Sequence, residues 1–228
     1  PPPSVNRGLI LRNFGIDGSR QTSGGGIQAN RPARCLFDNL LIRYCYEDGM
    51  ILGDAGHLSY HNTVHGCKFM DNGGSGHEGA GLHIVYSEEN DIEGNLFTTN
   101  YNDYGALEVT SGMQRIIGNH FNEEYKRGLY CSAGGQVIDG NTFDRVGEES
   151  IFLTASHKTV ISDCNFFDTS HASSGTDDMI YGVDSDGVRI SGVGFRVSGA
   201  SPTYPRYTVY STGTSDYWIV TSNDLRNS

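Results

Sequence analysis

Three residues whose side chains carry protons, His83, Glu108 and Tyr130, occupy the same place in three successive repeats of this chain. Each of them directly follows a leucine. A carboxylate beside a histidine favours the charged imidazole, and a neighbouring tyrosine can give or take a proton. If equivalent strands of successive repeats pair, these side chains lie about 5 Å apart on one exposed face. The spacing therefore predicts an acid–base site.

Other residues near this column extend the predicted site. We expect Asp54 to join His83, Glu108 and Tyr130 as a catalytic group, because it lies further along an equivalent strand. Loops between repeats place charged and aromatic side chains beside the column, and two further aromatic residues continue it as a platform for sugar rings. The expected substrate-binding residues are Glu78, Asp103, Tyr104, Lys126, Arg127, Phe152 and Tyr181.

A repeated pattern must position these residues. Its clearest copy contains Ile138, Asn141 and Phe143, and related triplets recur along the chain at intervals of 22 to 30 residues. A fixed inner pattern with drifting intervals indicates strands joined by loops of variable length, which is typical of a solenoid. The copies centre on Asn13, Asn39, Cys67, Asn95, Asn119, Asn141, Cys164, Val193 and Asn223.

Hydrophobic residues alternate with a period of two around these triplets, which predicts strands and not helices. Each repeat also carries an apolar residue nine to thirteen positions earlier, as Leu129 precedes Ile138. Stacking the repeats places like residues above one another. We expect the asparagines to form an inward ladder of amide hydrogen bonds and the phenylalanines to form a buried aromatic column.

The segment from Gly81-Leu82 through Asp91-Ile92-Glu93-Gly94-Asn95-Leu96-Phe97 resembles the coil repeat of the pectate-lyase-like superfamily. That superfamily includes pectate lyases, polygalacturonases, alginate-acting enzymes and phage tailspikes. The resemblance covers essentially all 228 residues. It implies an all-β fold, a single-stranded right-handed parallel β-helix, and the repeat count sets about nine coils in one domain over residues 1–228.

Three functions remain open for this chain. As a polysaccharide lyase it would use Tyr130, His83, Lys126 or Arg127 as base or charge neutraliser, although the catalytic arginine and triple-aspartate calcium patterns of the superfamily do not map onto it. As a glycoside hydrolase it would pair Glu108 with Asp54, Glu78 or Asp103, although the paired-aspartate motif of polygalacturonases is not present. As a non-catalytic solenoid it would bind sugar or serve a virion or cell-surface assembly.

Net charge and composition limit the classes of partner that this chain is expected to bind. A formal net charge of −11 argues against nucleic acid or an anionic membrane as the main partner. No apolar run approaches the roughly 20 residues of a membrane span. We therefore expect a polysaccharide partner, action outside the cell or on a virion surface, and no cofactor, with Ca²⁺ the one ion that the resemblance allows. An extended lead-in over residues 1–7 and no end caps predict an oligomer such as a trimer, or further domains over the open ends.

We interpret the cysteines and a series of three histidines as structural residues and not as metal ligands. Cys67 and Cys164 replace ladder asparagines and Cys131 faces inward, so we expect buried free thiols there, and the states of Cys35 and Cys45 are open. Histidines at 57, 61 and 65 are spaced four apart, but a glycine interrupts them and the last falls in a predicted strand. We expect solvated histidines and no metal site.

Overall fold

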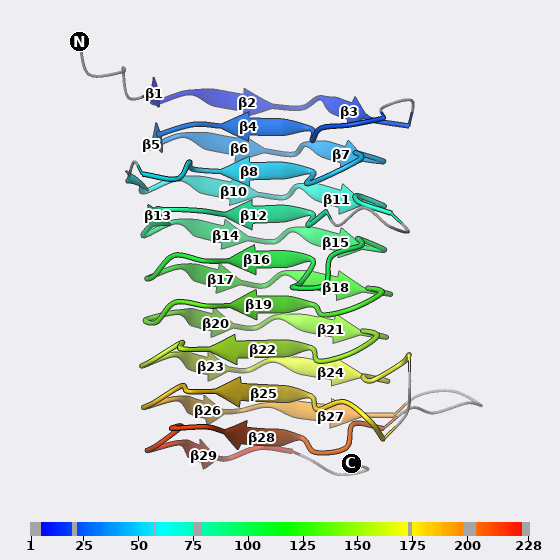
Figure 1. Ribbon diagram of the computed structural model, residues 1–228, viewed down its shortest axis with the longest axis vertical. Coiled ribbons are helices and arrows are strands. Elements are labelled where there is room, and N and C mark those ends of the chain that lie inside the picture. The colour runs from blue at the N-terminus through cyan, green and yellow to red at the C-terminus, as the bar shows by residue number, and fades with distance from the viewer. Residues whose placement is uncertain are drawn as a thin grey trace.

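The structure is a computed structural model that describes residues 6–19, 22–56, 58–74, 79–172, 175–197 and 204–224. In these ranges the chain forms 29 short strands and no helix, so no described segment could cross a membrane as a helix. The strands stack in parallel, coil upon coil, from the N-terminal to the C-terminal end (Figure 1). The predicted right-handed parallel β-helix is confirmed, and its longest sheet holds nine strands, one from each coil.

Three long sheets and one short sheet run along the solenoid. Sheet I comprises β4 (Ile27–Ala29), β8 (Met50–Leu52), β12 (Leu82–Ile84), β16 (Leu107–Val109), β19 (Leu129–Cys131), β22 (Ile151–Thr154), β25 (Ile180–Val183) and β28 (Val209–Thr212). Sheet II comprises β2 (Ile10–Arg12), β6 (Leu36–Asp38), β10 (Thr63–His65), β14 (Asp91–Glu93), β17 (Arg115–Ile117), β20 (Val137–Asp139), β23 (Val160–Ser162), β26 (Arg189–Ser191) and β29 (Ile219–Thr221). Sheet III comprises β3 (Gly15–Asp17), β7 (Leu41–Arg43), β11 (Lys68–Met70), β15 (Leu96–Thr98), β18 (His120–Asn122), β21 (Thr142–Asp144), β24 (Asn165–Phe167) and β27 (Gly194–Arg196). The corner sheet comprises β1 (Asn6–Arg7), β5 (Pro32–Ala33), β9 (Ser59–Tyr60) and β13 (Ser87–Glu88).

The asparagine ladder forms as predicted in the middle of the solenoid. The side-chain oxygen of Asn119 accepts hydrogen bonds from the backbone and side-chain nitrogens of Asn95, at 2.9 and 3.0 Å. Asn141 does the same for Asn119 at 2.9 and 3.0 Å, and Asn119 Nδ2 donates to Ile92 O at 2.8 Å. Each buried amide is thereby satisfied by the coils on either side of it, which removes the cost of burying it.

The aromatic column also forms as predicted. Phe97 and Phe121 stack with ring centroids 4.9 Å apart, and Phe121 and Phe143 stack at 4.7 Å. The column runs on to Phe69 at one end and to Phe166 at the other. All of these rings are fully buried. Each pair adds about 0.5–1.5 kcal/mol beyond the apolar area that it buries.

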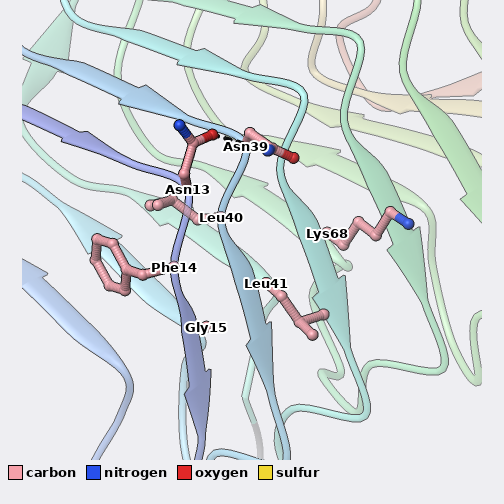
Figure 2. Close-up of a pocket in the computed structure, with 7 residues that line it drawn as sticks. All are labelled: Asn13, Phe14, Gly15, Asn39, Leu40, Leu41 and Lys68. Carbon is pink, nitrogen blue, oxygen red and sulfur yellow. Dashed lines mark hydrogen bonds between the residues drawn. The ribbon is translucent and has the colours of Figure 1, made fainter.

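The predicted register is wrong by one residue in the first two coils. Phe37 pairs with Val64 and Ile42 pairs with Phe69, so neither Leu36 nor Leu41 begins a core column. Asn13 and Asn39 consequently lie outside the ladder, exposed at a corner with φ of 61° and 52°. An amide hydrogen bond of 2.9 Å joins them. Both line a surface pocket of about 430 Å³ (Figure 2).

The left-handed backbone at this corner explains the error. Gly66, Gly94, Gly118 and Gly140 occupy the same corner in later coils, with φ between 61° and 63°. Asparagine is among the few other residues that tolerate this conformation. Asn39 therefore takes the place of a corner glycine and not that of a ladder amide. The pattern Asn-x-Leu is compatible with both positions, so it does not distinguish a corner asparagine from a ladder asparagine.

Sheet I shows two similar slips. Met50 pairs with Leu82, so Met50 and not Ile51 is the inward residue of its coil, and Leu52 is buried. In the last coil Val209 pairs with Ile180, which makes Tyr210 the outward neighbour of Tyr181. The outward column of sheet I therefore reads Gln28, Ile51, His83, Glu108, Tyr130, Phe152, Tyr181 and Tyr210.

Two further polar ladders were not predicted. One passes through Asn62, Asn90 and Gln114, whose side-chain amides bond from coil to coil at 2.9 and 2.7 Å. The other passes through Asn72 and Asn100, joined at 2.9 Å, and ends on the carboxylate of Glu124. Glu124 accepts the backbone N–H of Asn100 at 2.8 Å and is almost fully buried.

The five cysteines are free and buried, which confirms the prediction for Cys67, Cys131 and Cys164 and settles Cys35 and Cys45. Of the extended lead-in predicted over residues 1–7, positions 1–5 lie outside the described residues, and Asn6–Arg7 pairs with Pro32–Ala33. The first coil leaves Ile10 59% exposed. An oligomer or further domains over the ends stays a prediction.

Candidate functional site

The predicted column of proton-carrying residues is present on the outer face of sheet I. His83 pairs with Glu108 and Glu108 pairs with Tyr130, in register across β12, β16 and β19. Phe152 and Tyr181 continue the column on β22 and β25. Each strand turns its flanking residues into the core, because side chains alternate between the two faces of a strand. The alternation fixes these residues outward, but Glu108, which was predicted to be exposed, is buried, with 8% of its surface accessible.

A carboxylate that was not predicted holds His83 from the other side. Nδ1 of His83 lies 3.3 Å from Oδ2 of Asp48, and Nε2 lies 3.6 Å from Oε1 of Glu108. Asp48 is itself fixed, because its Oδ1 accepts the backbone N–H of Ala80 at 2.7 Å. Nε2 is shielded from solvent and makes no hydrogen bond among the described residues. Asp48 thus fixes the orientation of the His83 ring through Nδ1, while Nε2 faces Glu108.

Small residues beside the column let Asp48 reach the histidine. Ala80 and Gly105 lie three residues before His83 and Glu108, in positions that Asp48 and Arg127 occupy in the flanking coils. A Cβ atom on Gly105 would lie 2.9 Å from the backbone nitrogen of Tyr130, so this position has no room for a side chain. The short residues leave His83 and Glu108 flanked by an acidic side chain on one side and a basic one on the other.

Burial and charge shift the pKa values of this pair. Burial alone lowers the pKa of His83, but the hydrogen bond to Asp48 and the negative charges of Glu108 and Asp48 outweigh it, so the pKa is raised. Burial raises the pKa of Glu108, against the opposing effects of His83 and of a 3.0 Å hydrogen bond from Asn102 Nδ2. The raised pKa of His83 favours an imidazolium beside Glu108.

Tyrosine and phenylalanine rings continue from this pair along the sheet. Burial, and then the charge of Glu108, raise the pKa of Tyr130, so its hydroxyl stays protonated at neutral pH. The Tyr130 ring contacts Tyr104 with centroids 5.2 Å apart and stacks on Phe152 at 5.7 Å. The structure therefore brings Tyr104 and Phe152 to the column as predicted.

The two predicted cations lie beside the column but are already paired. Nζ of Lys126 is 2.9 Å from Glu148 and 3.6 Å from Asp103. Nε of Arg127 is 2.6 Å from the nearly buried Glu149, and its guanidinium lies 4.6 Å from the centre of the Phe152 ring. Carboxylates outnumber cations here, so the surface is locally acidic.

Two predicted residues are not brought to this cluster. Asp54 follows the end of β8, three positions beyond the point that aligns with His83, and pairs with Arg31 at 3.8 Å. That offset is roughly 10 Å along a strand. Glu78 lies outside the described residues. Of the histidine series, His57 also lies outside them, while His61 pairs with Glu89 and His65 with Asp38.

Several partners of the site were missed because they lie outside the strands from which the column was predicted. Asp48 and Asn102 lie in inter-strand loops and reach the column only through tertiary packing. Glu149 precedes β22 by two residues, and no motif marks it as the partner of Arg127. The one usable signal was the short side chains of Ala80 and Gly105, which mark a place where another side chain can enter.

Comparison with known proteins identifies the family. Residues 13–182 match the family described as "Periplasmic copper-binding protein (NosD)". The chain belongs to the NosD family. No curated protein matches this sequence.

Solved structures show what the NosD-family coil resembles. A "Glycoside hydrolase" aligns with a TM-score of 0.55 and 9% identity, over 90% of this chain and 39% of its own length. That identity indicates a shared fold only, and this chain spans about two fifths of that protein. A protein of Parabacteroides merdae ATCC 43184, provisionally described as a glycosyl hydrolase, aligns over 90% of this chain and 84% of its own at 13% identity. Its TM-score of 0.33 is too low to carry an argument.

The described residues do not fit the copper site that the family description implies. Copper favours thiolate, thioether and imidazole ligands. All five thiols are buried, and burial raises the pKa of Cys45 and of Cys67 to about 11. No group of three or more histidine, cysteine or acidic residues in the described ranges is arranged to hold a metal ion.

Proposed function

We propose that this chain binds a neutral polysaccharide along the outer face of sheet I and hydrolyses it with His83 and Glu108. The observation that carries the proposal is the 3.6 Å approach of His83 Nε2 to Glu108 Oε1, in a ring whose other nitrogen is held by Asp48. A base or acid whose far side is fixed by a carboxylate is the arrangement that proton-transfer catalysis uses. The adjoining aromatic row supplies a surface for sugar rings.

The ionisation of the pair assigns the roles. When His83 is an imidazolium and Glu108 a carboxylate, Glu108 accepts a proton from the attacking water, while His83 donates one to the leaving glycosidic oxygen. The products are two hydroxyl groups. The proton on Glu108 then returns to Nε2 once the two atoms close from 3.6 Å to hydrogen-bonding distance, which restores the starting state. Asp48 acts as a positioning residue that keeps the ring orientation and favours its charged form.

Charge supports a neutral substrate. Asp48, Glu108, Glu148 and Glu149 all lie at this surface, and the Lys126 and Arg127 cations are compensated by the last two and by Asp103. A uronate polymer would bring more negative charge to an acidic face, which like-charge repulsion disfavours. The same compensation leaves neither Lys126 nor Arg127, the two cations described beside the column, free to neutralise the carboxyl group of a lyase substrate. The proposal therefore favours hydrolysis over β-elimination.

The test is a panel of polysaccharides with two readouts. Xylan, glucomannan and mixed-linkage β-glucan are incubated beside polygalacturonate and alginate, and both new reducing ends and new unsaturated ends are measured. The expected result is reducing ends from a neutral polymer, with loss in Glu108→Gln and His83→Ala but not in Glu93→Gln, an exposed control on β14. Unsaturated ends from a uronate polymer would overturn hydrolysis in favour of a lyase.

A second function, binding without catalysis, is favoured by two observations. Nε2 of His83 is shielded from solvent, and Tyr130 and Phe152 stack on each other with planes 11° apart. Such cross-strand stacking also stabilises an ordinary sheet surface. In this case the panel would show retention of a polymer with no new ends from any of the five substrates.

Location follows from the family. Proteins of the NosD family are described as periplasmic. We extend this to the chain itself, which would then meet its polysaccharide outside the cytoplasm. Fractionation of the source cells with an antibody to the chain tests this directly.

A further inference from the structure

A second cluster of aromatic and charged residues lies at the far end of the same column. Tyr181 on β25 stacks with Tyr210 on β28, with centroids 5.5 Å apart, and Tyr210 stacks with Tyr207 at 5.1 Å. The guanidinium of Arg206 lies 5.2 Å from the centre of the Tyr210 ring and 5.5 Å from that of Tyr207. The cluster was not predicted, apart from Tyr181.

A buried carboxylate holds the arginine in place. Nε and Nη2 of Arg206 donate to the two oxygens of Asp178 at 3.1 and 2.8 Å, and the Asp178 side chain is fully buried. The backbone N–H of Tyr207 donates to Asp178 as well, at 3.2 Å. The third guanidinium nitrogen, Nη1, has no hydrogen-bond partner in the described part of the chain. A fixed, half-exposed donor thus lies beside a tyrosine ring that is 52% exposed.

The arrangement resembles that at the first cluster, except that the carboxylate lies one coil after Arg127 and one coil before Arg206. Arg127 lies over Phe152 and is fixed by Glu149, just as Arg206 lies over Tyr207 and Tyr210 and is fixed by Asp178. The carboxylate precedes the outward aromatic residue by three positions in both coils, Glu149 before Phe152 and Asp178 before Tyr181. The carboxylate partner neutralises the charge of each arginine, and the guanidinium N–H groups remain hydrogen-bond donors.

We propose that Tyr207, Tyr210 and Arg206 form a distal subsite for a pyranose unit of a neutral glycan. The Tyr207 ring supplies a stacking surface and Arg206 Nη1 donates to a sugar hydroxyl. Because Asp178 compensates the arginine, the subsite carries no net charge that would select a uronate. This inference rests on the proposed function for its substrate class, but binding at the subsite does not require cleavage.

The separation of the two clusters sets the length of glycan that reaches both. β16 and β28 are four strand steps apart in sheet I, through β19, β22 and β25 (Figure 1). Four steps amount to roughly 19 Å. A short oligosaccharide bound at Glu108 ends before Tyr207, whereas a polymer covers both. The subsite therefore contributes to the binding of long chains alone.

The test is affinity electrophoresis in gels that contain xylan, glucomannan or mixed-linkage β-glucan, with every variant made in a Glu108→Gln background. Tyr207→Ala is compared with Tyr217→Ala, a matched control whose tyrosine is 86% exposed and lies on another corner, beside His157 and Lys158. The expected result is about a fivefold loss of affinity in Tyr207→Ala and none in Tyr217→Ala. In the active chain, KM should rise for the polymer and stay unchanged for a short oligosaccharide.

Each outcome separates the subsite from the catalytic proposal. Equal retention of Tyr207→Ala and its parent would overturn the subsite and leave hydrolysis standing. Weaker retention of Tyr207→Ala, with no cleavage by the unmutated chain, would support the subsite and overturn hydrolysis. Failure of all three neutral polymers to retard the parent would overturn the subsite.

Discussion

Nε2 of His83 faces Oε1 of Glu108 at 3.6 Å, and no hydrogen bond joins them. The ring is held from its other side by Asp48, whose hydrogen bond and charge help to raise the pKa of His83. The proton balance of the site therefore depends on a residue that lies outside the outward column.

Replacing Asp48 should lower the pKa of His83. In Asp48→Asn the imidazolium loses both a hydrogen bond and a nearby negative charge, so it releases its proton at lower pH. Titration of the His83 ring resonances by NMR measures the shift without any need for activity. The other histidine resonances are internal controls and should not move. An unchanged His83 midpoint would show that Asp48 does not govern this ring.

Glu124→Gln should stabilise the protein at neutral pH. Glu124 is almost fully buried, and burial raises its pKa well above 4.5, with no cation opposing the shift. A raised carboxyl pKa contributes stability that is present below pH 4.5 and is lost as the pH rises through the folded-state value. Glutamine carries no charge to bury and can continue the ladder as Gln114 does. We expect a gain of about 1–3 kcal/mol at neutral pH.

Urea unfolding of Glu124→Gln at several pH values measures this gain. The difference from the unmutated chain should shrink as the pH falls, and it should level off below pH 4.5, where Glu124 is protonated in both states. Glu93→Gln, an exposed substitution on β14, provides the control. A variant that is less stable than the parent at neutral pH would show that the carboxylate is needed in the ladder.

Removing one rung of the asparagine ladder should be costly. In Asn119→Ala the backbone and side-chain N–H groups of Asn95 lose their acceptor inside the solenoid. We expect a loss of about 1–3 kcal/mol in the free energy of unfolding. Asn39→Gly is the matched comparison, because Asn39 is exposed with a φ of 52°, which glycine adopts freely. Equal destabilisation by the two substitutions would contradict the ladder assignment.

The thiols should be inert in the folded protein. All five are buried, and burial raises the pKa of Cys164 to about 12 and that of Cys67 to about 11. Little thiolate then exists at pH 8, and thiolate is the reactive form. Ellman's reagent should label none of the five in buffer and all five in guanidinium chloride. Rapid labelling of a native thiol would show that the coils open locally.

The repeating part of the fold was readable from the sequence, whereas its exceptions were not. Ile138, Asn141 and Phe143 recur because each must fit the same residue in the next coil, so the pattern records the packing. Asn39 misled the register because asparagine suits both an inward ladder and a left-handed corner, and the residue alone does not distinguish them.

The candidate site divides in the same way. His83, Glu108 and Tyr130 follow directly from the strand register, which the sequence shows. Asp48 is 35 residues from His83 and reaches it from a loop, beside the small residue Ala80, whose backbone N–H it accepts. The loops between coils differ in length and path, so the strand periodicity does not show which loop residues contact the column.

The stacking of whole coils also makes distance along this face a matter of counting. Each rung of sheet I advances the surface by one strand spacing, so the gap between Glu108 and Tyr210 changes only in whole rungs and not gradually. Gain or loss of a coil between them would lengthen or shorten the reach by about 4.8 Å while leaving both clusters intact. In a solenoid of this kind, the number of coils between two binding clusters therefore sets the distance between them.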